Sequence, residues 1–226
     1  MKGTLLMGSV LLASVAITGC SSKLTQPEEY SGFLKDYAQL KEAESPSGAP
    51  VMRWVDPKLD VKKYSSVYIE PSQLYPRPEP TEKISAQTLQ GITSYYDQAL
   101  KRELGKSMRL ATSPGPGTLI VRPAITAVSS KTEGLKPYEV IPIALVAAAV
   151  STASGIRDQE TTIGTEAAFI DAGNNQVIAE VVRKGTGKPL ENSSQQMTVD
   201  DTKKVLDGWA ADVHQSYVNL QATQTK

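Results

Sequence analysis

The chain has 226 residues, with 24 basic and 24 acidic side chains and a hydrophobic fraction of 40%. This length suits one domain or a domain with a tail, and charges that alternate in sign do not build the basic face that nucleic-acid binding needs. With one Cys and one His, neither an internal disulfide nor a site with two imidazole ligands can form.

The amino terminus has the pattern of a signal peptide. Lys2 supplies a positive start, and residues 5–17 form an uncharged run that is shorter than the roughly 20 apolar residues of a stable membrane span. The run ends in Ile17, Thr18, Gly19 and Cys20. A retained anchor helix and an ordinary secretory signal with a chance Cys are the alternatives.

This ending resembles the lipobox of bacterial lipoproteins. The resemblance implies a signal peptide over 1–19, cleavage between Gly19 and Cys20, and acyl chains on the Cys20 sulfur and the new amino terminus. Each buried methylene contributes about 0.8 kcal/mol, so several chains hold a protein on a membrane. Ser21 follows where Asp would favour the inner membrane. The resemblance therefore favours the outer membrane, periplasm-facing, over the inner membrane.

Residues 20–29 are polar with Pro27, which predicts a lipidated tether, and residues 30–226 are then a single periplasmic domain. In chain order, this domain is expected to hold a short helix or turn over 30–45, a strand around Val67 and Ile69, an extended proline loop over 76–80 and an amphipathic helix within 81–108. A strand over 119–127 contains Pro123, which favours an edge strand or a bulge.

Two later elements have clearer signals. Runs rich in β-formers at 161–170 and 177–183 are joined by DAGNN, which predicts a hairpin. Residues 197–221 predict a helix with a capping box of Thr198 and Asp201. Its buried stripe is Leu206, Trp209, Val213, Tyr217 and Leu220. Together the elements predict an α+β fold, a mostly antiparallel sheet with amphipathic helices packed on one face.

An apolar stretch at 140–156, VIPIALVAAAVSTASGI, carries no charge over its length. Three interpretations compete: a helix packed on the sheet, a surface segment that docks with a partner or with lipid, and a membrane-inserted hairpin. Small residues every fourth position permit close helix contact.

No convincing catalytic or metal-binding set emerges. His214 stands alone, and Asp200 with Asp201 suits a helix start. GTGKP at 185–189 has Pro where a phosphate loop needs Ser or Thr, and DAGNN lacks the closing Glu of an EF-hand loop. We therefore expect no catalytic residues, no cofactor, no metal and no enzymatic activity.

The segments YSGFLKDYAQL, WVDP at 54–57 and VYIEP resemble an uncharacterised family of Gram-negative lipoproteins, domain of unknown function 3313. The layout is also similar to envelope-lipoprotein domains of curli-secretion and Tol-associated proteins. The resemblance brings no catalytic residues.

The first functional hypothesis is a lipid-anchored, non-enzymatic module that binds an envelope protein, with Tyr75, Arg77 and 140–156 as exposed candidates. The second is a self-associating subunit of an envelope export or assembly complex that uses 140–156. A cell-envelope hydrolase is the third.

Overall fold

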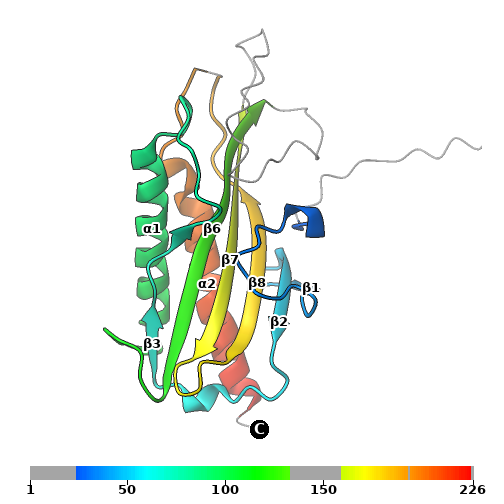
Figure 1. The fold of residues 1–226 in the computed structure, drawn as a ribbon, viewed down its shortest axis with the longest axis vertical. Coiled ribbons are helices and arrows are strands. Elements are labelled where there is room, and N and C mark those ends of the chain that lie inside the picture. The colour runs from blue at the N-terminus through cyan, green and yellow to red at the C-terminus, as the bar shows by residue number, and fades with distance from the viewer. Residues whose placement is uncertain (1–23, 133–158, 193, 225–226) are drawn as a thin grey trace, which may run out of the picture.

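The computed structural model describes residues 24–132, 159–192 and 194–224 (Figure 1). The described elements, in chain order, are a 3₁₀ turn Pro27–Glu29, β1 Lys41–Glu44, β2 Pro50–Val55, a 3₁₀ turn Val61–Lys63, β3 Ser66–Ile69, β4 Gln73–Leu74, α1 Ala86–Leu104, β5 Arg109–Leu110, β6 Thr118–Thr132, β7 Gln159–Asp171, β8 Val177–Thr186 and α2 Asp200–Thr223. The predicted α+β class is confirmed.

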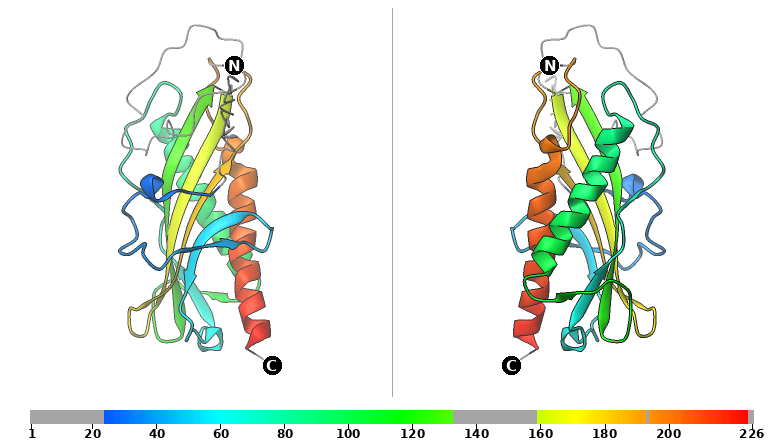
Figure 2. Two further views of the ribbon diagram at one scale, coloured as in Figure 1. Left: turned by 90° about the vertical axis from the view of Figure 1, so that its right-hand side faces the viewer. Right: turned by 90° about the vertical axis from the view of Figure 1, so that its left-hand side faces the viewer.

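The strands form one mixed sheet in the order β1-β2-β8-β7-β6-β3-β5, with β4 paired to β6 beyond the end of β3. The ladder from β1 to β6 is antiparallel, whereas β3, β4 and β5 pair in parallel. Both helices pack on one side of the sheet, as the amphipathic patterns predict (Figure 2). Residues 24–40 lie across part of the opposite side.

The strand β6 occupies the middle of the sheet. The expectation that Pro123 marks an edge strand is therefore wrong, because β6 has β7 on one side and β3 and β4 on the other. Pro123 falls between the residues paired with β3 and those paired with β4, where the partner strand is interrupted. The bulge alternative has support close by, since the register shifts between Ile125 and Ala127.

The helix α1 begins at a Ser85 cap, whose side chain accepts the Thr88 N–H at 3.0 Å. It is shorter at both ends than the range of 81–108. Its buried stripe is Leu89, Ile92, Tyr96, Ala99, Leu100 and Leu104, which confirms the predicted period.

The helix α2 crosses α1 and runs the length of the sheet (Figure 2). Asp201 accepts hydrogen bonds from the Thr198 N–H at 2.8 Å and hydroxyl at 2.9 Å, which is one half of the predicted capping box. Leu206, Trp209 and Tyr217 are buried and Val213 and Leu220 pack against the core. The predicted stripe is confirmed.

The β7–β8 hairpin is also confirmed. In its turn, Asn175 has a φ of 61° and Asp171 accepts the Gly173 N–H at 2.7 Å. Asn tolerates this left-handed backbone, which is why the Gly and Asn pattern predicts the turn.

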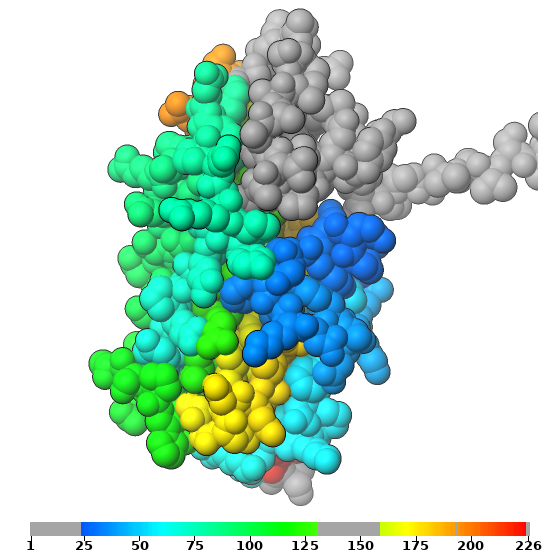
Figure 3. Space-filling view, in the orientation of Figure 1, coloured from blue at the N-terminus to red at the C-terminus, as the bar shows by residue number. Residues whose placement is uncertain are grey.

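Of the short helix or turn predicted over residues 30–45, the structure has turns and no helix. Between the 3₁₀ turn and β1 the chain is irregular, and Gly32 has a φ of 85°. Leu34 and Leu40 are buried against Ile170 and Val182 on the outer side of the sheet. We call residues 24–40 the strap, and Figure 3 shows it lying across the sheet.

The strap includes residues that the sequence assigned to the tether. Thr25 is buried, and Glu29 forms an ion pair with Lys184 of β8 at 2.7 Å. The packed part of the chain therefore begins before residue 30.

Candidate functional site

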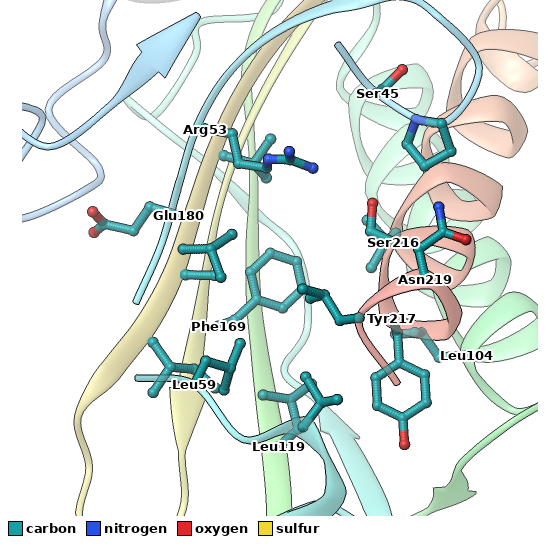
Figure 4. Close-up of a pocket in the computed structure, with 18 of the residues that line it drawn as sticks. Ser45, Arg53, Leu59, Leu104, Leu119, Phe169, Glu180, Ser216, Tyr217 and Asn219 are labelled. Carbon is teal, nitrogen blue, oxygen red and sulfur yellow. The ribbon is translucent and has the colours of Figure 1, made fainter. Parts of the chain in front are cut away.

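A cavity of about 590 Å³ lies between the carboxyl-terminal half of α2 and the helix side of β2, β8 and β7 (Figure 4). We call it the α2 cavity. Its wall is mainly apolar and includes Val55, Leu104, Leu119, Phe169, Ile178, Ala179, Val181, Val213, Tyr217 and Leu220. This size and lining are typical of small-ligand sites.

The cavity exists because the sheet extends beyond the helices. The helix α1 contacts α2, β3 and β4, whereas α2 contacts β8 and the 3₁₀ turn Val61–Lys63. The β1–β2 turn curves toward α2 (Figure 2), where the Ser47 N–H donates to Asp212 at 2.9 Å. The turn and helix thus bridge one end of the space and leave the cavity beneath.

The bridged end holds a buried ion pair. Arg183 Nη1 donates to Asp212 Oδ2 at 2.9 Å, and both side chains are more than nine-tenths buried. The Ser47 hydroxyl donates to the same carboxylate oxygen at 3.0 Å. Arg183 Nε, by contrast, has no hydrogen-bond partner among the described residues. Removing either member of such a pair leaves a buried charge uncompensated, so the network fixes α2 to β8.

A second cation stands at the polar side of the cavity. Arg53 lies on β2 between Val51 and Val55 on the same face of the strand. Figure 4 shows its guanidinium directed toward α2, with Ser216 and Asn219 across the space. Within the described part of the chain the Arg53 side chain forms neither a hydrogen bond nor an ion pair, and the residue is only partly exposed.

The opposite side of the sheet carries a different polar cluster. Glu166 of β7 is 0% exposed and accepts the Ser31 N–H at 2.8 Å and the Tyr37 hydroxyl at 2.6 Å. Tyr37 in turn accepts the Gly32 and Leu34 N–H groups. Burial, with the Glu166 hydrogen bond, raises the pKa of Tyr37 to about 12. This cluster fastens the strap to the sheet.

Glu180 of β8 lies close to that cluster. Burial raises its pKa, and the negative charges of Asp36 and Glu166 add to the rise. Its side chain points away from the α2 cavity in Figure 4, although its backbone borders the lining.

The residues expected to bear on function are scattered. Gly19, Cys20 and the stretch at 140–156 lie outside the described residues, so lipidation, cleavage and the export-subunit hypothesis stay predictions. Tyr75 is 37% exposed and packs edge-on against Phe33 at 5.6 Å. Arg77 is exposed nearby.

The polar residues and the loop that the sequence analysis weighed as catalytic or binding candidates contact other parts of the domain. His214 Nε2 lies 2.8 Å from the Ser107 hydroxyl. Asp200 pairs with Lys203 on the surface, whereas Asp201 is buried at the helix start. In GTGKP, Gly187 lies so close to the start of α2 that a Cβ at this position would clash with the Asp201 carbonyl oxygen. This loop packs under the helix.

Sequence reasoning missed Arg53, Arg183 and Glu166. A usable signal was present, because each is a charged residue at an inward position of a β-rich run, as in VMRWV and TEAAF. Among the described residues, no cluster of three or more His, Cys, Asp or Glu is placed to hold a metal ion. Neither described helix is long and apolar enough to cross a membrane.

Solved structures resemble this fold only loosely. The PelC dodecamer from Paraburkholderia phytofirmans has a TM-score of 0.40 and 11% identity over 73% of this chain and 96% of its own. A DUF330 protein from Xanthomonas campestris has a TM-score of 0.42 and 12% identity over 72% of this chain and 90% of its own. These scores are too low to transfer an assembly or a ligand.

Sequence relatives are much closer. The uncharacterized lipoprotein YdcL of Escherichia coli (strain K12) is 42% identical over 211 residues, which is 93% of this chain and 95% of the relative. The model of the protein family of unknown function DUF3313 matches residues 29–213. The chain therefore belongs to the DUF3313 family, and its relative YdcL is an uncharacterized lipoprotein.

Proposed function

We propose that this protein is a lipid-anchored lipoprotein of the Gram-negative outer membrane, facing the periplasm, and that its domain is a non-enzymatic binding module. The α2 cavity is its ligand site. The observation that carries the proposal is an apolar cavity of about 590 Å³ with an unpaired guanidinium, that of Arg53, beside it.

Three of the buried acids, Asp212, Glu166 and Asp201, support a binding role over catalysis. Asp212 is occupied by Arg183 and Ser47, and Glu166 is occupied by the strap. Asp201 caps the start of α2. A general acid or base must reach the reacting group, and each of these carboxylates serves a structural bond instead.

The anchor follows from the lipobox resemblance and from the lipoprotein relative. Thr25 is already buried in the domain, and five residues of extended chain span at most about 18 Å. Acyl chains on Cys20 would therefore hold the strap side of the domain close to the bilayer, with the α2 cavity on the far side of the sheet.

The binding role is tested with the mature chain, exported through a non-lipoprotein leader and carrying Cys20→Ala. N-phenylnaphthylamine, an apolar fluorescent probe, should brighten on binding. Ala179→Leu fills the cavity wall and should weaken binding, whereas Ala211→Leu, the same change on the exposed side of α2, should not. Equal binding by both variants would remove the cavity from the proposal.

The non-enzymatic role is tested by recovery of the ligand. Envelope lipids that copurify with the mature chain should be released chemically intact, as judged by mass spectrometry before and after incubation. Conversion of a lipid with turnover would contradict the proposal and favour a hydrolase.

The location is tested with the native chain. Density separation of membranes should place it with the outer membrane, and mass spectrometry should find an acylated amino terminus at Cys20. An unmodified thiol or an uncut leader would overturn the anchor.

A further inference from the structure

We propose that the α2 cavity binds a single-chain amphiphile with an anionic head group, the acyl chain against the apolar wall and the head group on Arg53. This inference deepens the proposed function and depends on the same cavity. It specifies the chemistry of the ligand, which the apolar wall by itself leaves open.

The position of Arg53 is the first argument. Its neighbours on the same face of β2, Val51 and Val55, are apolar, and Val55 lines the cavity. The planar guanidinium presents paired donors that match a carboxylate or a phosphate. Since no described residue accepts a hydrogen bond from the Arg53 guanidinium, this capacity is free for a ligand.

The charges around Arg53 are the second argument. In the β1–β2 ladder Lys41 lies directly opposite Arg53, and directly paired residues project to the same face. Two like charges in this position repel each other, and Lys41 has no ion pair in the described region. An anionic head group would relieve the repulsion.

Acidic groups nearby do not neutralise the pair. Glu44 contributes to the lining but is exposed and forms no ion pair with Arg53. Glu180 points to the other side of the sheet (Figure 4). From Val213 to Thr223, α2 contains no Asp or Glu. The cavity therefore favours an anion over a cation.

The interior favours a hydrocarbon chain. The hydroxyls of the two tyrosines in its lining are already used, because the Tyr64 hydroxyl donates to Asp171 at 3.0 Å and the Tyr217 hydroxyl donates to the Tyr64 carbonyl at 3.3 Å. Phe169, Leu119 and Leu104 supply wall without hydrogen-bonding groups (Figure 4). Burying an unpaired polar group there is unfavourable, so the polar end of a ligand belongs at Arg53.

The test compares head groups on one chain length. Calorimetry of the mature Cys20→Ala chain is carried out with dodecanoate, dodecyl phosphate, dodecanol and dodecyltrimethylammonium, each below its micelle concentration. The two anions should bind most tightly and the cation most weakly. A preference between the anions tells a fatty-acid carboxylate from a lipid phosphate. Equal affinity for the four head groups would overturn the inference.

Arg53→Gln should weaken binding of the preferred anion about tenfold or more, because a hydrogen bond to a charged group is lost. It should leave dodecanol binding unchanged. Arg109→Gln makes the same change on β5, at the opposite edge of the sheet, and should change neither. If Arg53→Gln weakened the binding of the anion and of dodecanol equally, Arg53 would not be the residue that recognises the head group.

Failure of this inference is separable from failure of the proposed function. If N-phenylnaphthylamine binds and Ala179→Leu blocks it while the head groups are not distinguished, the cavity remains a binding site and the anionic specificity is wrong. If the probe and all four amphiphiles fail to bind a chain that unfolds cooperatively, both are wrong. Arg53→Lys keeps the positive charge but loses the paired donors of the guanidinium. Its affinity for the preferred anion should therefore lie between those of the parent and Arg53→Gln.

Discussion

The two sides of the sheet are covered by different kinds of structure. The side facing α1 and α2 holds one large apolar core from β3 to α2, with the buried Arg183–Asp212 ion pair at one end of the α2 cavity. The strap side has a smaller core around Leu34, Ile170 and Val182 and is fastened by hydrogen bonds to the buried Glu166. Burial of apolar area therefore contributes most of the stabilisation on the helix side, whereas a few hydrogen bonds hold the strap on the other side.

The difference implies that the two sides of the sheet respond differently to the loss of a single contact. On the helix side, apolar packing is distributed over many residues. The core therefore stays stable although the space under α2 is not filled by side chains. The strap, in contrast, depends on a few acceptors whose loss would release it locally. Local release from a stable remainder is common in proteins.

The largest effect is expected for Leu206→Ala. Leu206 is 0% exposed in the helix-side core, and truncation of such a Leu costs about 2–5 kcal/mol through lost burial and a residual cavity. Chemical denaturation should show this loss as a single unfolding transition with its midpoint at a lower denaturant concentration. Leu110→Ala, at an exposed edge position, should change the free energy of unfolding by about 0.5 kcal/mol or less. If both variants lowered the free energy of unfolding by a similar amount, burial in the helix-side core would not explain the effect.

Glu166→Ala should act on the other side. It leaves the Ser31 N–H and the Tyr37 hydroxyl without their acceptor, at a cost of about 1–3 kcal/mol. Hydrogen exchange should rise over 31–40 more than in β7. Glu191→Ala, at an exposed acid, is the control. Unchanged exchange in the strap would show that Glu166 does not fasten it.

Glu180→Gln should stabilise the protein at neutral pH. Burial raises the pKa of Glu180 in the folded state, so the stability linked to its protonated form is complete below the unfolded pKa and is lost as pH rises through the folded one. The variant and the parent should therefore converge below about pH 4.5, the ordinary Glu value. Denaturation curves over pH test this; a variant less stable than the parent at neutral pH would contradict it.

Lys184→Met is expected to have the smallest effect. Lys184 pairs with Glu29 of the strap at 2.7 Å, with both side chains 17% exposed. Pairs near the surface contribute about 1 kcal/mol or less, and salt weakens them. Thermal unfolding at low and high salt should show the difference shrinking with salt. Lys188→Met, an exposed control, should show no salt-dependent difference from the parent.

Local patterns predicted much of this fold. The stripe of α2, the period of α1 and the DAGNN turn each depend on residues within a few positions of one another, and all were confirmed. The site was harder to predict. Arg53 stands in a strand whose inward face is set by its pairing with β8, and no local pattern states which face that is.

The strap shows why the turn alternative for residues 30–45 prevailed over the helix. Phe33, Leu34, Tyr37 and Leu40 have helical spacing, yet the N–H groups of this segment are bonded to side-chain oxygens instead of to helical carbonyls. One of these acceptors is Glu166, 135 residues away. Tertiary contacts of this kind override a weak local preference.

The sequence by itself determined the elements with strong local period, the family resemblance and the expected address at Cys20, because these depend on neighbouring residues or on a short motif. Only the tertiary structure decided that Pro123 lies mid-sheet, that Glu166 fastens the strap and that Arg53 faces an apolar cavity. These features arise where segments far apart in the chain meet, and burial and pairing at such meetings depend on the whole fold.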